Sequence, residues 1–83
     1  MYQLLIEKQV QKQLEKIPEP DFSRVKKAIL DLTKDPRPAG FAKLKGRSGY
    51  RIRQGNYRVL YDINDRILTV FILAAGHRKE IYE

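Results

Sequence analysis

The chain has 83 residues, no cysteine and a single histidine, and its formal net charge is +7. A chain of this length predicts one domain with a small core, spanning residues 1–83. The absence of cysteine excludes disulfides and thiolate metal sites, and a lone histidine argues against structural zinc. No signal peptide is visible, and the longest mostly apolar run, residues 67–75, is shorter than the roughly 20 residues of a membrane span. We therefore expect a soluble, cytoplasmic protein without membrane association or cofactor.

The positive charge is concentrated in the second half of the chain. Residues 43–79 contain nine Lys and Arg against two Asp, whereas residues 1–42 contain eight basic against six acidic residues. Concentrated positive charge attracts phosphate backbones and accelerates encounter with them. The distribution favours a nucleic acid or an acidic protein as partner over a merely soluble basic surface.

The first half of the chain predicts a short strand at residues 2–6 and two amphipathic helices, at residues 7–17 and 21–35. Two prolines between the helices end the first one, and Asp21 is expected to cap the start of the second. The apolar side chains at helical spacing are Val10, Leu14 and Ile17 in the first helix and Phe22, Val25, Ala28, Ile29 and Leu32 in the second. We expect the two helices to form an antiparallel hairpin.

A β-hairpin is predicted over residues 50–63, after a loop and a short extended piece at residues 43–46. Gly55-Asn56 suits a two-residue turn that needs positive φ. With this turn, Arg53 faces Arg58, and opposed residues share one face of the sheet. One face then holds Tyr50, Ile52, Tyr57, Val59, Tyr61 and Ile63, and the other holds Arg51, Arg53, Arg58, Leu60 and Asp62.

The opposed arginines are costly for the hairpin. Like charges directly across two strands destabilise the pair by up to about 1 kcal/mol. Conflicts of this kind between local rules and sequence are expected at functional sites. We therefore expect the face that carries Arg51, Arg53 and Arg58 to bind phosphate.

Residues 67–75 are apolar on both faces and predict a central strand that packs on the helices with one side. The other side is expected to hold Leu60 with either Phe71 and Leu73 or Val70 and Ile72. This strip either binds a protein partner or is covered by the chain's own ends. We expect Gly76 to break the strand, before a basic tail and a last extended piece.

The motifs KLKG, YRIR, NYRVLY and GHRKEIY, in this order and spacing, resemble the RelE family of bacterial and archaeal toxins, within the RelE/ParE superfamily. The resemblance covers nearly the whole chain. It implies an α+β fold: a small antiparallel sheet of about four strands packed on an N-terminal two-helix hairpin, in the order β-α-α-β-β-β.

The resemblance also implies an activity and partners. RelE toxins are metal-independent endoribonucleases that cut mRNA in the A site of the 70S ribosome. A cognate antitoxin of the RelB kind wraps and neutralises them. Carried over by motif, the expected catalytic residues are Arg51, Arg53, Arg58, His77, Arg78 and Tyr82, and the expected RNA-binding residues are Lys43, Lys45, Arg47 and Lys79.

The chain departs from the best-known family pattern by having arginines where the YKIK-like strand of relatives has lysines. Arginine cannot act as a base because it does not lose its proton, so Arg51 and Arg53 are expected to clamp the phosphate. His77 has the intrinsic pKa for proton transfer, with Glu80 as a second candidate base. An ordinary surface role for His77 stays open, and Tyr82 either orients the 2′-OH or packs against a strand.

Two other functions stay open. A ParE-like toxin shares the fold, poisons DNA gyrase and cleaves no RNA, and such sequences generally lack the assembled set of basic, His and Tyr residues. A basic RNA-binding module without catalysis would bind RNA with an affinity that falls steeply with salt.

Overall fold

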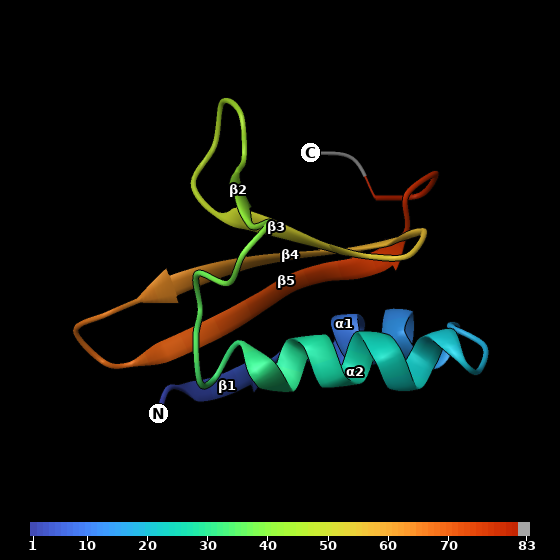
Figure 1. Ribbon diagram of the computed structural model, residues 1–83, viewed down its shortest axis with the longest axis horizontal. Helices are drawn as coiled ribbons and strands as arrows, with labels where there is room; N and C mark the ends of the chain where they lie inside the picture. Colours follow the sequence, from blue (N-terminus) through green and yellow to red (C-terminus); the bar gives the residue numbers. More distant parts are fainter. Residues whose placement is uncertain (82–83) are drawn as a thin grey trace.

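The computed structural model describes residues 1–81 and has two layers, a sheet and a pair of helices on one of its faces (Figure 1). The elements are β1 (Gln3–Ile6), α1 (Lys8–Glu15), α2 (Asp21–Asp31), β2 (Ala42–Lys43), β3 (Tyr50–Gln54), β4 (Tyr57–Asn64) and β5 (Thr69–His77). The α+β class is as predicted. We call the sheet face opposite the helices the outer face.

The sheet has five strands in the order β1-β5-β4-β3-β2. β1 runs parallel to β5, and the other neighbouring pairs are antiparallel. The sheet is therefore mixed and has one strand more than the four predicted antiparallel strands. The parallel pair is possible because the long connection that it requires carries both helices.

The main core lies between the helices and the sheet. Both predicted helical stripes point into it, because their apolar residues recur once per turn and so share one helix face. Its buried residues are Val10, Ile17, Val25, Ile29, Leu32, Ile52, Val59, Tyr61, Val70, Ile72 and Ala75. The Tyr61 hydroxyl donates a hydrogen bond to the Pro36 carbonyl at 2.7 Å, which satisfies a polar group in this core.

The β3–β4 hairpin has the predicted turn and register. Gly55 has a φ of +59°, the left-handed conformation that this turn requires and that glycine adopts without a Cβ penalty. Arg53 pairs with Arg58, and Ile52 pairs with Val59. The alternation of apolar and basic residues therefore identified both faces of the hairpin correctly.

The predicted N-cap of the second helix is wrong. Asp21 is already helical, and Pro20 occupies the N-cap position without a side-chain cap. The Glu19 carboxylate instead accepts hydrogen bonds from the Ser23 backbone N–H at 3.0 Å and the Ser23 hydroxyl at 2.8 Å. Asp21 lies in the first turn, where its negative charge complements the helix dipole.

Gly76 does not break the last strand, contrary to the prediction. β5 runs from Thr69 to His77, and Gly76 pairs with Arg58. A Cβ at Gly76 would lie 3.0 Å from Cγ1 of Ile81, which folds back over the strand. The backbone of Gly76 is therefore packed closely by another side chain, and glycine leaves room for it.

The outer face carries a small second cluster. Leu44, Leu60 and Ile81 are buried there, so the chain's own C-terminal segment covers Leu60. Val70 and Ile72 point to the main core, which leaves Leu73 on the other side, 37% exposed. The chain thus covers only part of the apolar strip that the sequence predicts.

Candidate nucleic-acid interface

Three arginines meet at the tip of the β3–β4 hairpin. Arg53 and Arg58 are cross-strand partners, and Arg78 follows β5. The Arg78 backbone N–H donates to the Asn56 carbonyl at 2.8 Å, which fixes the turn after β5 beside the hairpin turn. Together they line a pocket of about 250 Å³, which we call the arginine pocket; its lining is Arg53, Gly55, Asn56, Tyr57, Arg58 and Arg78.

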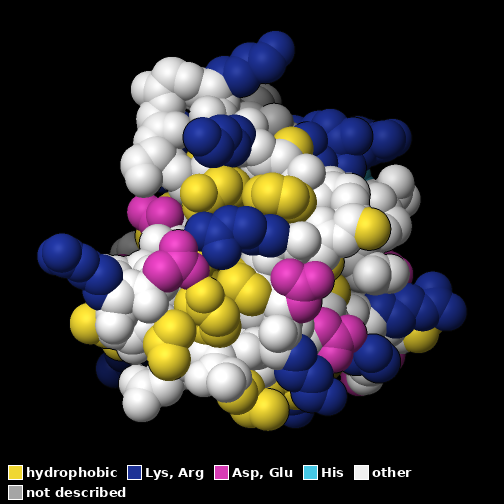
Figure 2. Space-filling view, turned by 60° about the vertical axis from the view of Figure 1, so that its left-hand side comes forward, with side chains coloured by type: hydrophobic (Ala, Val, Ile, Leu, Met, Phe, Trp, Pro, Cys, Tyr) yellow, Lys and Arg dark blue, Asp and Glu magenta, His cyan; other side chains and the backbone are white. Residues whose placement is uncertain are grey.

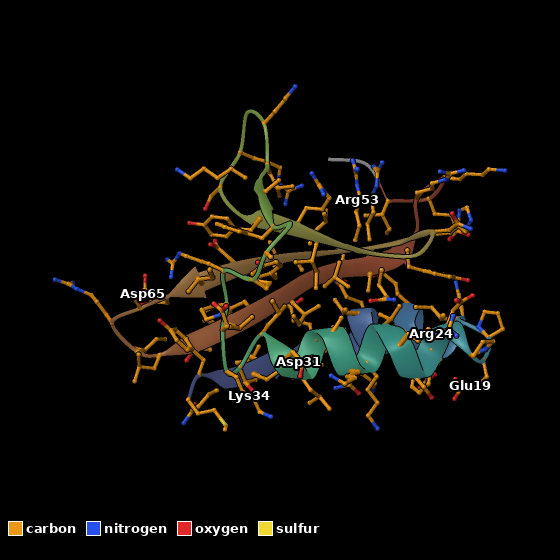
Figure 3. The ribbon with its side chains drawn as sticks, in the orientation of Figure 1. Glu19, Arg24, Asp31, Lys34, Arg53 and Asp65 are labelled. Atoms are coloured by element: carbon orange, nitrogen blue, oxygen red, sulfur yellow. The ribbon has the colours of Figure 1, made fainter. Side chains whose placement is uncertain are left out.

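The arginine pocket opens on the outer face. Figure 3 shows Arg53 projecting from the sheet on the side away from the helices. Arg58 is half-buried, and its Nη1 approaches the Ile81 carbonyl oxygen at 3.5 Å. None of the described residues that line the pocket is acidic. A site of this composition suits a phosphate, because guanidinium groups bind phosphate oxygens with two parallel hydrogen bonds.

The other predicted basic residues lie around this pocket but do not line it. Arg51 is half-buried on the same face and pairs with Leu60. Lys43 and Arg47 line a separate hollow of about 170 Å³ in the β2–β3 region. Lys45 and Lys79 are exposed. The predicted RNA-binding residues are therefore not gathered in one site.

His77 lies on the opposite side of the sheet from the arginines. It pairs with Tyr57, whereas its neighbour Gly76 pairs with Arg58. Successive residues of a strand point to opposite faces, so His77 faces the helices, as Tyr57 does. The two rings meet edge to face, with centroids 5.6 Å apart and an interplanar angle of 81°. The expectation that His77 joins the basic patch is not met by this geometry.

The hydrogen bonding of His77 also bears on proton transfer. Its Nδ1 accepts a hydrogen bond from the Lys79 backbone N–H at 3.1 Å. In the neutral ring, this bond assigns the proton to Nε2. This hydrogen bond occupies the Nδ1 lone pair. Glu80 lies in the turn after β5 and lines the same pocket as His77, and Tyr82 falls outside the described residues.

Within residues 1–81, no three His, Cys, Asp or Glu side chains are grouped so that they could hold a metal ion. The helices of this part are all too short or too polar to cross a membrane.

Residues 4–82 match the family described as the ParE toxin of the type II toxin–antitoxin system parDE. The chain belongs to this toxin family. Toxin RelG of Mycobacterium tuberculosis is 39% identical over 56 residues, which cover 66% of this chain and 64% of RelG, less than two thirds of its length.

Solved structures of toxins named RelE are similar over almost the whole chain. The archaeal RelE–RelB complex from Pyrococcus horikoshii OT3 matches with a TM-score of 0.82 and 31% identity, covering 96% of this chain and 98% of that one. The RelBE2 toxin–antitoxin complex from Mycobacterium tuberculosis matches with a TM-score of 0.81 and 29% identity, covering 93% and 98%. The chain is thus a toxin of the RelE type.

Two residues that shape the site of this RelE-type toxin were not singled out from the sequence. Tyr57 lines the arginine pocket and packs against His77. Ile81 seals the outer-face cluster beside Arg58. The signal for Tyr57 was available, since it is the first residue after the predicted turn. Ile81 gave no signal, because its contacts depend on how the chain turns after β5.

Proposed function

We propose that this RelE-type toxin is a metal-independent endoribonuclease that cuts mRNA in the A site of the 70S ribosome, as a single cytoplasmic domain. The observation that carries the proposal is the arginine pocket: Arg53, Arg58 and Arg78 converge on a space that a phosphate would fill. The names of the relatives support the same class, since they are RelE and RelG toxins.

In the proposed reaction, the ribose 2′-OH attacks the adjacent phosphorus and the bond to the 5′-oxygen breaks. The products are a 2′,3′-cyclic phosphate and a 5′-hydroxyl. Negative charge develops on the phosphorane oxygens, and fixed guanidinium groups stabilise it at the point where it appears. The 2′-OH proton passes to a base, and the leaving 5′-oxygen takes up a proton.

The residues divide by position. Arg53, Arg58 and Arg78 hold the scissile phosphate, and Arg51 supports them on the same face. We assign proton transfer to the end of β5 and the segment after it, with His77 and Glu80 as the candidates that the structure describes and Tyr82 orienting the 2′-OH. The residues that we assign to flanking phosphates and ribosomal RNA are Lys43, Lys45, Arg47 and Lys79.

The test is incubation of the purified protein with ribosomes carrying a defined mRNA, with cleavage mapped by primer extension. Arg58→Ala and Arg78→Ala are expected to slow cleavage by about 10²–10³-fold, the loss typical of removing one preorganised charge stabiliser. Arg66→Ala is the matched control, because Arg66 is exposed in the β4–β5 turn at the other end of the sheet. Intact mRNA in the wild-type reaction would falsify the proposal.

The main alternative is gyrase poisoning, which the ParE name of the family suggests. A gyrase supercoiling assay distinguishes it from mRNA cleavage. Inhibited supercoiling with untouched ribosomes assigns the chain to gyrase poisoning. Salt-sensitive RNA binding without cleavage or growth arrest assigns it to a non-catalytic RNA-binding module.

We further propose that a RelB-like antitoxin neutralises the protein. The support is that similar toxins from Pyrococcus horikoshii and Mycobacterium tuberculosis were solved as complexes with their antitoxins. Expression of the toxin gene should arrest growth, and co-expression of the neighbouring gene should restore it. If neither neighbouring gene restores growth and neither gene product co-purifies with the toxin, this pairing is contradicted.

A further inference from the structure

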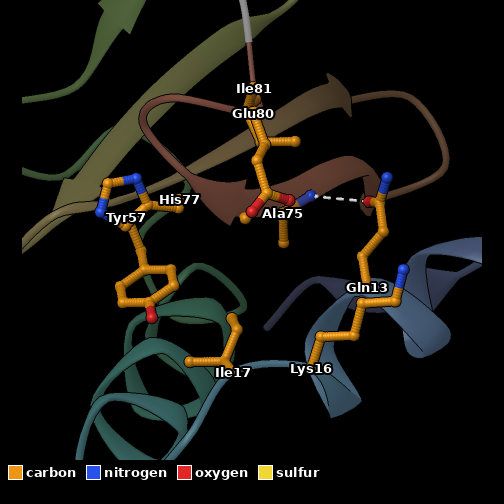
Figure 4. A pocket seen from close by; sticks show the side chains of 9 residues that line it. Gln13, Lys16, Ile17, Tyr57, Ala75, His77, Glu80 and Ile81 are labelled. Atoms are coloured by element: carbon orange, nitrogen blue, oxygen red, sulfur yellow. Dashed lines mark hydrogen bonds between the residues drawn. The ribbon is translucent and has the colours of Figure 1, made fainter.

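A second pocket, of about 270 Å³, lies beside the helices at the same end of the sheet as the arginine pocket (Figure 4). β1 ends opposite Ile72, so residues 73–77 of β5 extend beyond it and leave a sheet edge open toward α1. We call this the edge pocket; its lining includes Gln13, Lys16, Tyr57, His77, Glu80 and Ile81.

The edge pocket combines flat aromatic walls with hydrogen-bonding groups. In Figure 4, the rings of Tyr57 and His77 lie on one side and the Gln13 and Lys16 side chains on the other. Gln13 Oε1 accepts the Ala75 backbone N–H at 3.0 Å, so the amide is held in place and offers its Nε2 as a donor. Lys16 adds donors and Glu80 adds acceptors. Splayed RNA bases are recognised by this combination of aromatic stacking and edge hydrogen bonds.

The edge pocket is small. Its volume of about 270 Å³ falls just below the roughly 300–1,000 Å³ of sites for drug-sized ligands. The charged and amide groups around it make a poor site for an apolar side chain of a protein partner, because burying them without hydrogen bonds is costly.

Tyr57 connects the two pockets, because it lines both. The two pockets lie on opposite faces of the sheet and share only Tyr57 among their described lining, so a nucleotide with its phosphate among the arginines has to reach around this end of the sheet to place a base in the edge pocket. We propose that the edge pocket receives a nucleobase of the mRNA next to the scissile phosphate and thereby sets the codon preference. This inference rests on the nuclease function proposed above.

The first experiment measures codon preference with ribosomes programmed with a panel of A-site codons that differ at one position. Lys16→Met removes a hydrogen-bonding group from the edge pocket and keeps its aliphatic length. It is expected to reduce the ratio of cleavage rates between the best and worst codons by about tenfold, because a site that hydrogen-bonds its substrate discriminates strongly against mismatched groups. Lys12→Met, one turn earlier on α1, is the control and should keep the wild-type ratio. An unchanged ratio in Lys16→Met overturns the inference.

The second experiment needs neither ribosome nor cleavage. The protein is titrated with the four nucleoside 3′-monophosphates and, separately, with inorganic phosphate, and followed by NMR. The nucleotides are expected to shift the side-chain signals of His77 and Gln13, whereas inorganic phosphate shifts only the lining of the arginine pocket, Tyr57 included.

The two experiments separate the two proposals. If no nucleotide moves the edge-pocket signals while mRNA is still cut, the edge pocket is not a base site and the nuclease assignment stands. If the nucleotides move those signals but ribosomal mRNA stays intact, the base site stands and the nuclease assignment falls.

Discussion

The two ends of the sheet use arginine in opposite ways. At the β4–β5 turn, Arg37 Nη2 lies 2.9 Å from Asp65 Oδ2, and the Tyr2 hydroxyl donates to Asp65 Oδ1 at 2.5 Å. On the face that Figure 2 brings forward, acidic and basic side chains are interspersed, with apolar side chains between them. At the hairpin tip, Arg53, Arg58 and Arg78 line a pocket with no acidic residue among its described lining.

The role of an arginine therefore depends on the residues around it. At the β4–β5 turn, the Asp65 carboxylate binds both the Arg37 guanidinium and the Tyr2 hydroxyl. These contacts connect the start of the chain, the loop after α2 and the turn. The Arg37 hydrogen bond holds the pKa of Asp65 below its usual range, and Asp65 raises the pKa of Tyr2. At the hairpin tip, Arg53 and Arg58 instead face each other across two strands, a placement of like charges that is destabilising in general.

Arg53→Thr is expected to have the largest effect, and it tests whether the arginines at the hairpin tip serve the site or the fold. Cleavage on the ribosome should fall by about 10²-fold, because a charge that stabilises the transition state is lost. The free energy of unfolding should rise by up to about 1 kcal/mol, since the repulsion with Arg58 disappears and threonine favours a strand. Urea titration and the cleavage assay measure both. A loss of stability together with activity would show that Arg53 serves the fold rather than the site.

Gly76→Ala tests whether the outer face depends on the close packing of Ile81. The new Cβ would lie 3.0 Å and 3.2 Å from Cγ1 and Cδ1 of Ile81, so we expect a cost of about 1–3 kcal/mol from overpacking. Cleavage should also fall, because the Ile81 carbonyl lies beside Arg58 Nη1.

The control for Gly76→Ala is the double variant with Ile81→Ala, which removes both atoms that clash. Its loss of stability should be smaller than the sum of the two single losses. Strict additivity would mean that Gly76 is needed for its backbone alone.

Tyr61→Phe tests how the core holds the loop that carries Arg37, because Tyr61 bonds the carbonyl of its neighbour Pro36. It removes the 2.7 Å hydrogen bond to the Pro36 carbonyl and should cost about 1–3 kcal/mol without changing cleavage at equal folded concentration. Burial raises the pKa of Tyr61 to about 12, so the native state favours the neutral hydroxyl. This contribution is complete below pH 10 and is lost as the pH rises toward 12, and thermal unfolding of the phenylalanine variant should lack that alkaline loss.

Asp65→Asn is expected to have the smallest effect, because its ion pair with Arg37 is exposed to solvent. The lowered pKa of Asp65 means that its contribution is complete above the ordinary value of 3.8 and disappears as the pH falls through the lower folded-state value. Thermal melts should therefore show a small difference from wild type at neutral pH that closes in acid. A difference that persists at the lowest pH would assign the effect to packing.

Local alternation was sufficient to predict the hairpin. Two independent patterns, apolar residues and arginines, agreed on one register, and a shift by one residue would have buried arginines. The helical stripes were equally readable, since Val25 and Ile29 recur with the period of a helix. The alternation therefore placed Arg53 and Arg58 on one face, whereas Arg78 was expected only from the family resemblance, and its approach to the hairpin turn was not predicted.

The remaining features depend on contacts between distant segments. Nothing in the sequence of β1 specifies a parallel partner in β5. The face of His77 was missed because Gly76 was taken as the end of the strand, and because a register shift between β4 and β5 places Ile72 and Ala75, three residues apart, on the same face. A glycine can end a strand, or it can lie within a strand where another side chain packs against its backbone. The local sequence does not distinguish these two roles.

The parallel pairing of β1 with β5 has a consequence for the cell that makes this protein. The first strand finds its hydrogen-bond partner only when residues 69–72 have left the ribosome. The turn that brings Arg78 to Asn56 is made later still. During synthesis, therefore, the nascent chain can neither complete its sheet nor bring its three arginines together before its last strand is available.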